Sequence, residues 1–182
     1  MLQPVFLPFP ELMTPRLRLR FIVPEDAESL LFLRSSEDVM HYIDKERMKT
    51  REDALALIQK MTDGIHTGTG INWGISLRND PTLLGTIAFW RLIPENYRAE
   101  IGYMLHPNFH GRGLMSEAMT EVIRYGFEVM NLHSIEANIN PGNEVSRKLL
   151  LKFGFQKEAY FRENYFFNGK FLDSDIYSLI RT

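Results

Sequence analysis

The stretch that decides the fold is EIGYMLHPNFHGRGLMSEAM, residues 100–119. It overlaps a strand signal, RAEIGYML (98–105), and leads directly into a helical pattern. Between the two, Gly111 and Gly113 flank Arg112 at the start of that helix. Glycine has no Cβ, so a large ligand can approach the amides of such a loop, where the helix dipole places about half a positive charge. The loop is therefore either a pyrophosphate cradle or a plain connection between strand and helix.

The elements predicted around this stretch belong to one mixed domain. Three successive strand signals, separated by the turn sequences NDP and PEN, indicate an antiparallel meander. A right-handed crossover through the next helix places a further strand parallel to the meander or splayed from it. We expect an α/β (α+β) fold: a mixed central sheet, mostly antiparallel with a splayed parallel pair, and helices on both faces. The predicted strands are 16–21, 71–78, 83–92, 98–105 and 133–140, with a hairpin about Asn168-Gly169, and the predicted helices are 25–36, 50–61, 113–130 and 143–153.

Composition limits the classes of function. At 182 residues and 45% hydrophobic, the chain suits a single domain, residues 1–182, with residues 1–13 as an N-terminal extension. A formal net charge of −2 argues against a nucleic acid partner. The chain has no cysteine, which excludes disulfides, thiolate metal sites and a cysteine nucleophile. No apolar run is long enough to span a bilayer and no signal peptide is evident, so we expect a cytoplasmic protein with no membrane partner.

Two familiar phosphate-binding loops do not match the glycine stretch. A Walker loop needs a Gly-Lys-Ser/Thr ending that is absent here. A dinucleotide-binding fingerprint needs a third glycine where Ser116 stands, and an acidic residue at the end of the next strand, whereas Glu136 lies inside it. A nucleotide triphosphatase and a dehydrogenase are both disfavoured.

Four segments in this chain resemble the GNAT superfamily of N-acetyltransferases, in particular the ribosomal-protein N-terminal alanine acetyltransferases. They are TPRLRLR (14–20), the 100–119 stretch, NEVSRKLLLKFGF (143–155) and NGKFLDSDIYSLI (168–180). Each is a weak signal alone, but together they cover nearly the whole chain in the family's order. The resemblance implies transfer of an acetyl group from acetyl-CoA to an amine, with the glycine loop holding the pyrophosphate of coenzyme A.

The family's loop pattern is Gln or Arg, two residues, Gly, one residue, then Gly or Ala. It falls on His110, Gly113 and Met115, so the first and last positions differ from the pattern. Neither difference removes a backbone amide, and the resemblance implies that the loop amides contact the cofactor. The cofactor-binding residues expected here are His110, Gly111, Arg112, Gly113, Leu114 and Met115.

Glu100 is the candidate general base. It alternates with Ala99 and Ile101, so it shares a strand face with Gly102 and Met104, where a carboxylate is costly to bury unless it is paired or faces a wet cleft. A salt-bridged structural residue is the alternative, and the family's habit of placing a glutamate on this strand favours catalysis. The resemblance also implies that the backbone of Met104 and Leu105 runs beside the pantetheine arm and supplies the oxyanion donor.

Asn143 and Ser146 lie three residues apart at the start of a helix. They are either a helix cap and a surface residue, or, as the resemblance implies, groups that approach coenzyme A, with the serine hydroxyl as a proton donor to the thiolate. Many relatives carry a tyrosine later in this helix as the acid, and the matching residue here is Leu150. Ser146, another tyrosine or water remains as the proton source. His106 and His110 flank Pro107 in a loop, so we expect no metal site.

The amine acceptor is expected between residues 34–49 and the hairpin about Asn168-Gly169. The aromatic residues there either pack on a ligand or serve the core or a homodimer contact, and the acidic ones either attract a cationic substrate or are merely solvated. These residues are Tyr42, Tyr165, Phe166 and Phe167, and Asp44, Glu46 and Glu163.

Three functions remain open at this point. The first is acetylation of a protein N-terminus, whose α-amino group titrates near about 8 and needs only mild deprotonation. The second is the same chemistry on a small molecule amine such as a polyamine, an amino acid or an aminoglycoside. The third is a sensor that binds acyl-CoA without turnover.

Overall fold

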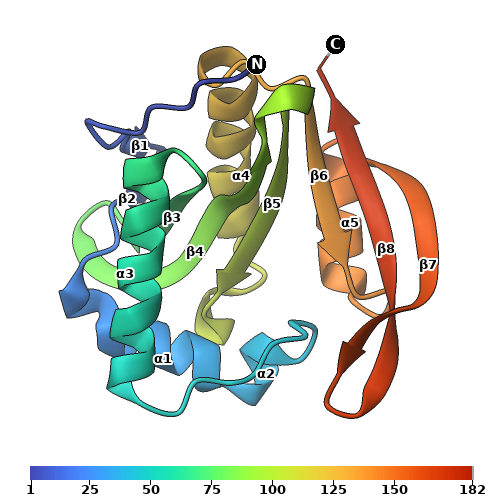
Figure 1. Ribbon diagram of the computed structural model, residues 1–182. Helices are drawn as coiled ribbons and strands as arrows, with labels where there is room; N and C mark the ends of the chain where they lie inside the picture. The colour runs from blue at the N-terminus through green and yellow to red at the C-terminus, as the bar shows by residue number, and fades with distance from the viewer. Residues whose placement is uncertain (182) are drawn as a thin grey trace.

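The computed structural model describes residues 1–181, in which eight strands form one sheet in the order β1-β2-β3-β4-β5-β6-β8-β7 (Figure 1). Every neighbouring pair is antiparallel except β5 and β6, which run parallel. The predicted mixed, mostly antiparallel sheet is therefore confirmed. The strands are β1 (Leu12–Met13), β2 (Leu17–Arg20), β3 (Ile71–Leu77), β4 (Asp80–Ile93), β5 (Arg98–Leu105), β6 (Ser134–Ile139), β7 (Gln156–Phe167) and β8 (Lys170–Ile180).

Helices cover both faces of the sheet, as predicted. One apolar core lies between the sheet and the first group of helices, α1 (Ala27–Ser35), α2 (Glu37–Met40) and α3 (Arg51–Thr67). The larger core lies on the other face, beneath α4 (Leu114–Arg124) and α5 (Glu144–Lys152) (Figure 1). Strand residues alternate between the two cores, so neighbouring side chains of β5 face different helices.

The parallel pair is short, and this creates an opening in the sheet. Only residues 98–100 of β5 pair with β6, where Glu100 lies opposite Glu136. Beyond Glu100, β5 stays with β4, because Leu105 still pairs with Gly85, whereas β6 stays with β8 as far as Ile139. The two strands therefore separate toward their carboxyl ends, which is the predicted splay (Figure 1).

Local sequence signals set several boundaries. Thr50 and Asp53 form the predicted reciprocal cap of α3: the Thr50 hydroxyl accepts from the Asp53 amide, and the Asp53 carboxylate accepts from the Thr50 amide. Asn168 and Gly169 have φ angles of 48° and 76°, which is the conformation of a two-residue hairpin turn. Helix α4 is shorter than predicted, because a π-helical turn (Tyr125–Val129) follows it.

Residues 1–13, expected as an extension, are packed against the domain. Leu2 and Phe6 are buried in the larger core, and Leu12 pairs with Leu19 to form the edge of the sheet. The Trp73 indole donates to the carbonyl of Pro10 at 2.7 Å, which holds the segment against β3. These contacts join residues far apart in the sequence, so no local pattern reveals them.

Candidate active site

The glycine loop has the backbone conformation that its glycines permit. Gly111 and Gly113 have φ angles of 71° and 75°, in the left-handed region that other residues rarely adopt, and α4 begins at Leu114. A Cβ added to Gly111 would meet no atom within 4 Å. Packing against the protein therefore does not explain this glycine, and its outer side is open to a ligand.

A run of unpaired amides lines this loop. Within the described chain, the N–H groups of residues 111–116 donate to no backbone or side-chain acceptor. The amide of His110 is an exception to the expected set, because it donates to the carbonyl of Pro107 at 3.0 Å, and its ring lies 2.8 Å from the carbonyl of Leu105. The free run therefore starts one residue later than predicted and extends to Ser116, a cradle for an anion at a helix N-terminus.

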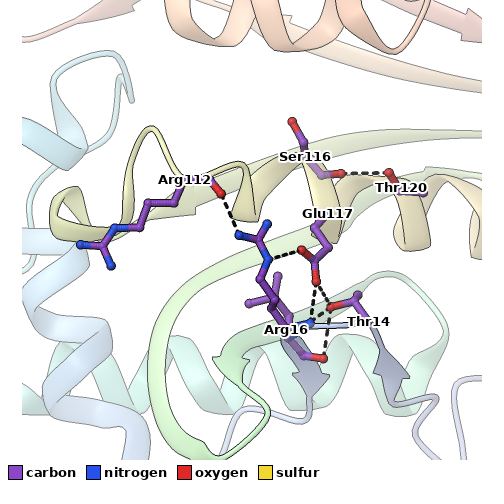
Figure 2. Close-up of polar contacts among 7 residues, drawn as sticks. Thr14, Arg16, Arg112, Ser116, Glu117 and Thr120 are labelled. Atoms are coloured by element: carbon purple, nitrogen blue, oxygen red, sulfur yellow. Dashed lines mark hydrogen bonds and ion pairs between the residues drawn. The ribbon is translucent and has the colours of Figure 1, made fainter.

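Contacts from the N-terminal segment hold this loop in place (Figure 2). The Glu117 carboxylate accepts from the Thr14 hydroxyl, the Arg16 amide and the Arg16 Nε, at 2.5, 2.8 and 2.6 Å. Although desolvation raises the pKa of Glu117, these hydrogen bonds outweigh it and lower the pKa. Arg16 also donates to the carbonyl of Arg112 at 3.0 Å. One arginine thus pairs with the first turn of α4 and satisfies a loop carbonyl beside the amide cradle.

Cationic groups surround the cradle. Lys152 of α5 donates to the Ser116 hydroxyl at 3.2 Å, and the Arg112 guanidinium lies 5.3 Å from the centre of the Phe109 ring. Together with Arg16 they add positive charge to that of the helix N-terminus. The site therefore suits a group with more than one negative charge, such as a diphosphate.

A cleft of about 530 Å³ lies at the opening between β5 and β6. Residues on opposite faces of β5, such as Gly102 and Tyr103, line it, as do α3 on one side of the sheet and the start of α5 on the other. The cleft therefore passes through the sheet. The predicted residues Glu100, Met104, Asn143 and Ser146 all lie in its wall.

Glu100 is a buried carboxyl group in the wall of the cleft. Its side chain is 8% exposed, and burial together with the facing carboxylate of Glu136 raises its pKa to about 7. Arg91, 3.7 Å away, and two other cations oppose the shift without cancelling it. A carboxyl group with a pKa near neutrality can exchange a proton at physiological pH. The ion pair with Arg91 bears out the salt-bridged alternative, but the raised pKa shows that this pair does not fix the charge of Glu100 at neutral pH.

Asn143 and Ser146 differ in which of their hydrogen-bonding groups remain available to a ligand. Asn143 caps α5, because its side-chain oxygen accepts from the Ser146 amide at 3.1 Å, so the cap interpretation is confirmed for this atom. Ser146 is half-buried in the cleft wall, not at the surface. Beside it lies Tyr103, whose buried hydroxyl makes no hydrogen bond of good geometry and whose pKa burial raises to about 12. Tyr103 is thus a hydroxyl donor that the sequence analysis did not single out.

The free edge of β5 presents backbone donors to the opening. The His106 amide donates to the carbonyl of Leu84 on the β4 side at 2.7 Å. Because successive amides of a strand point in opposite directions, those of Leu105 and Tyr103 point toward the opening and that of Met104 points toward β4. Leu105 is therefore the better placed of the two expected backbone donors, and Met104 contributes its side chain to the cleft.

The two predicted walls of the acceptor site do meet at this cleft. Residues Tyr42–Lys45 lie on one side and Asn164 and Tyr165 on the other, and the Tyr165 hydroxyl ties them together by donating to the carbonyl of Asp44 at 2.6 Å. Phe166 is 60% exposed and Phe167 stacks on Tyr165, so neither lines the cleft. Among the expected acidic residues, Asp44 lines it, whereas Glu46 and Glu163 do not.

Positive side chains in this cleft were missed at the sequence level. Arg34, Lys45 and Lys60 all line it. They come from α1, the following loop and α3, and no spacing rule brings them together. Across residues 1–181, no group of three or more His, Asp or Glu side chains is arranged to hold a metal, and no helix is long and apolar enough to cross a membrane.

Comparison with known proteins identifies the family. A family model for an acetyltransferase (GNAT) domain matches residues 16–156. The uncharacterized N-acetyltransferase YoaA of Bacillus subtilis (strain 168) is 39% identical over 173 residues, which are 95% of this chain and 98% of YoaA. The ribosomal protein uS5-alanine N-acetyltransferase of Escherichia coli (strain K12) is 31% identical over 107 residues, 58% of this chain and 55% of that protein.

The solved structures agree. RimL, a ribosomal L7/L12 alpha-N-protein acetyltransferase in complex with coenzyme A, matches with a TM-score of 0.86 over 94% of this chain and 98% of RimL; at 19% identity this likeness concerns the fold alone. A sheet opened between β5 and β6, a family model that spans most of the chain and a relative alike over nearly its full length lead to one conclusion: the chain belongs to the GNAT family and is an N-acetyltransferase.

Proposed function

We propose that the protein transfers the acetyl group of acetyl-CoA to the α-amino group at a protein N-terminus, in one step within a ternary complex. The observation that carries the proposal is Glu100, buried at the point where β5 and β6 separate, with a pKa of about 7. An α-amino group titrates near about 8, so this carboxylate is well matched to remove its proton. The relative that modifies the alanine of ribosomal protein uS5 supports the choice of acceptor.

The amide cradle fits the diphosphate of coenzyme A. The free N–H groups of residues 111–116, the open side of Gly111 and the nearby Arg112 and Lys152 supply donors and positive charge for it. The opening between the strands suits a narrow arm, which the unpaired edge of β5 would hold by its Leu105 and Tyr103 amides. When bound, acetyl-CoA supplies the activated acyl group.

The residues of the cleft divide the remaining tasks. Glu100 accepts the proton of the acceptor ammonium and so frees the lone pair that attacks. The Leu105 amide on the open strand edge is a donor for the carbonyl oxygen as negative charge gathers there. The hydroxyls of Ser146 and Tyr103 lie together on the α5 side as donors for the departing sulfur. Because its pKa is about 12, Tyr103 keeps its proton throughout the neutral range.

The cleft disfavours polycationic acceptors. Arg34, Lys45 and Lys60 line the acceptor side and would repel a polyamine or an aminoglycoside. A thiol-release assay with acetyl-CoA and a panel of short peptides, polyamines and aminoglycosides tests the proposal. We expect turnover on peptides with a free N-terminus, none on the same peptides with a blocked N-terminus, and none on the polycations. Turnover confined to small molecule amines would contradict it.

Replacing Arg16 should weaken coenzyme A binding. The Arg16→Gln variant releases the carbonyl of Arg112 and leaves Glu117 as an uncompensated negative charge beside the cradle, so we expect the Kd for coenzyme A to rise about tenfold. Calorimetry measures this directly. Arg18→Gln is the matched control, because Arg18 lies two residues further on, in β2, in an exposed ion pair with Glu11 and should leave the Kd unchanged. Equal affinities for the two variants would refute the positioning role.

Replacing Glu100 should slow the reaction without affecting cofactor binding. For Glu100→Gln we expect kcat to fall by about 10²–10⁴, with the Kd for coenzyme A unchanged. In the parent enzyme, Glu100 is protonated and inactive below pH 7, so kcat/KM should rise with pH through that value. Glu136→Gln removes a charge that raises the Glu100 pKa and should shift this limb to lower pH while keeping the plateau rate. An unchanged rate in Glu100→Gln, or an unshifted profile in Glu136→Gln, would show that another base acts.

Removing either hydroxyl donor should lower kcat more than it changes KM. Tyr103→Phe and Ser146→Ala each remove a donor for the departing sulfur, and we expect kcat to fall about tenfold or more with little change in the KM for acetyl-CoA. Tyr125→Phe is the control, because Tyr125 is buried in the larger core against Trp73. If Tyr103→Phe and Ser146→Ala both keep the parent kcat, as the control does, the proton reaches the sulfur from water.

A further inference from the structure

Three cationic side chains converge on the acceptor side of the cleft without acidic partners. Arg34 lies in the last turn of α1, Lys45 in the loop after α2 and Lys60 on α3. In residues 1–181, no carboxylate comes within ion-pair distance of any of them. Arg20, by contrast, forms an ion pair with Asp26 at 2.7 Å. The three cleft cations are therefore not part of the protein's own ion-pair network.

Arg34 shows most clearly that a partner is missing. Its Nε is buried and donates to no acceptor in the described chain, and burial lowers the pKa of the guanidinium. Buried polar groups of native proteins are nearly always hydrogen-bonded, and an unpaired buried charge opposes folding. The Arg20 Nε is also buried without an acceptor, but the terminal nitrogens of Arg20 donate to Asp26, whereas no nitrogen of the Arg34 guanidinium has an acceptor within residues 1–181. A ligand in the cleft would supply one.

The other charges in the cleft do not neutralise the three cations. The Lys45 ammonium lies 5.0 Å from the centre of the Trp90 ring; burial first, and then the charges of Arg34 and Lys60, lower its pKa. The acids that line the same cleft are Asp44 and Glu100, and burial raises the pKa of both. Three cations and two acids line the cleft, so it keeps a net positive charge even when both acids are ionised.

The phosphates of coenzyme A do not account for this cluster. None of residues 106–116, which form the amide cradle and its approach, lines the cleft in which Arg34 and Lys60 lie. The cluster instead shares its wall with Tyr42 and Tyr165, from the two segments that enclose the acceptor side. An anion here belongs to the acceptor.

We infer that Arg34, Lys45 and Lys60 form an anion subsite for a carboxylate side chain near the acceptor's N-terminus. The inference rests on the proposed function, because it takes the reactive amine to lie at Glu100. Each extended residue spans at most about 3.3–3.6 Å, so an Asp or Glu in the second or third position stays within the cleft. The substrate class is thus a protein whose first few residues are acidic.

Matched peptides test this subsite. Two peptides that differ only by Glu or Gln at positions two and three should differ at least about tenfold in kcat/KM for the parent enzyme, in favour of Glu. Lys60→Gln should reduce this ratio toward one by lowering kcat/KM on the Glu peptide, and should leave the Kd for coenzyme A unchanged. Lys49→Gln is the control, because Lys49 is exposed nearby but does not line the cleft, and it should keep the parent ratio.

Arg34→Met provides a second variant with a readout that a structural role would not give. It removes the buried charge and keeps the volume, so the Tm should be unchanged or raised while the preference for the Glu peptide is lost. A large fall in Tm, with the preference retained in Lys60→Gln, would overturn the inference. So would equal rates on the two peptides in the parent enzyme, an outcome that leaves the N-terminal acetyltransferase intact.

Binding separates this inference from the proposed function. If no peptide is acetylated, calorimetry of the Glu and Gln peptides with the coenzyme A-saturated enzyme still measures the subsite. Tighter binding of the Glu peptide that depends on Lys60 would support the subsite and contradict the proposed acceptor. Acetylation of free acidic amino acids, but of no peptide, would have the same meaning. Equal and weak binding of both peptides would overturn the subsite.

Discussion

The separation of β5 from β6 is the constraint on which the rest of this structure depends. The strands are paired only as far as Glu100, after which each follows its other neighbour in the sheet. An unpaired strand edge inside a protein leaves backbone groups without partners, which is costly unless a ligand or water satisfies them. The opening is sustained by the strong antiparallel pairing on either side, and it places a polar strand edge, a buried carboxyl group and two hydroxyls around one cleft.

Polar groups without a hydrogen-bond partner lie at both ends of the site. At the start of α4 it is a run of free amides, and on the acceptor side it is an unpaired guanidinium. Other charges close to the helices are paired, as in the contact of Arg16 with Glu117 or of Arg20 with Asp26. Because the free amides and the Arg34 guanidinium border the cradle and the cleft, we assign them to binding.

Glu100 illustrates how burial sets chemistry. An exposed glutamate is ionised at neutral pH and is too weak a base for an ammonium group. Burial of Glu100 in the sheet, and then the negative charge of Glu136 opposite it, raise the pKa of Glu100 to about 7. The parallel register that ends at this residue therefore contributes to the basicity on which the proposed role of Glu100 rests.

The sequence by itself determined the elements whose signals are local. The cap formed by Thr50 and Asp53, the turn at Asn168-Gly169 and the strand alternation that turns Glu100 toward the cleft all arise within a few residues, where chain geometry decides the outcome. The glycine loop is also a local signal. That the His110 amide donates to the carbonyl of Pro107, however, could be seen only from the conformation of the turn.

Only the tertiary structure decided which distant residues share a site. Arg16 and Glu117 are 101 positions apart, Tyr103 meets Ser146 from another element, and Arg34 and Lys60 converge from two helices. Such neighbours are set by how helices and strands pack, and packing leaves no periodicity in the sequence that names the partner. The charge of the acceptor cleft, opposite to that suggested by its nearby acidic residues, follows from this packing alone.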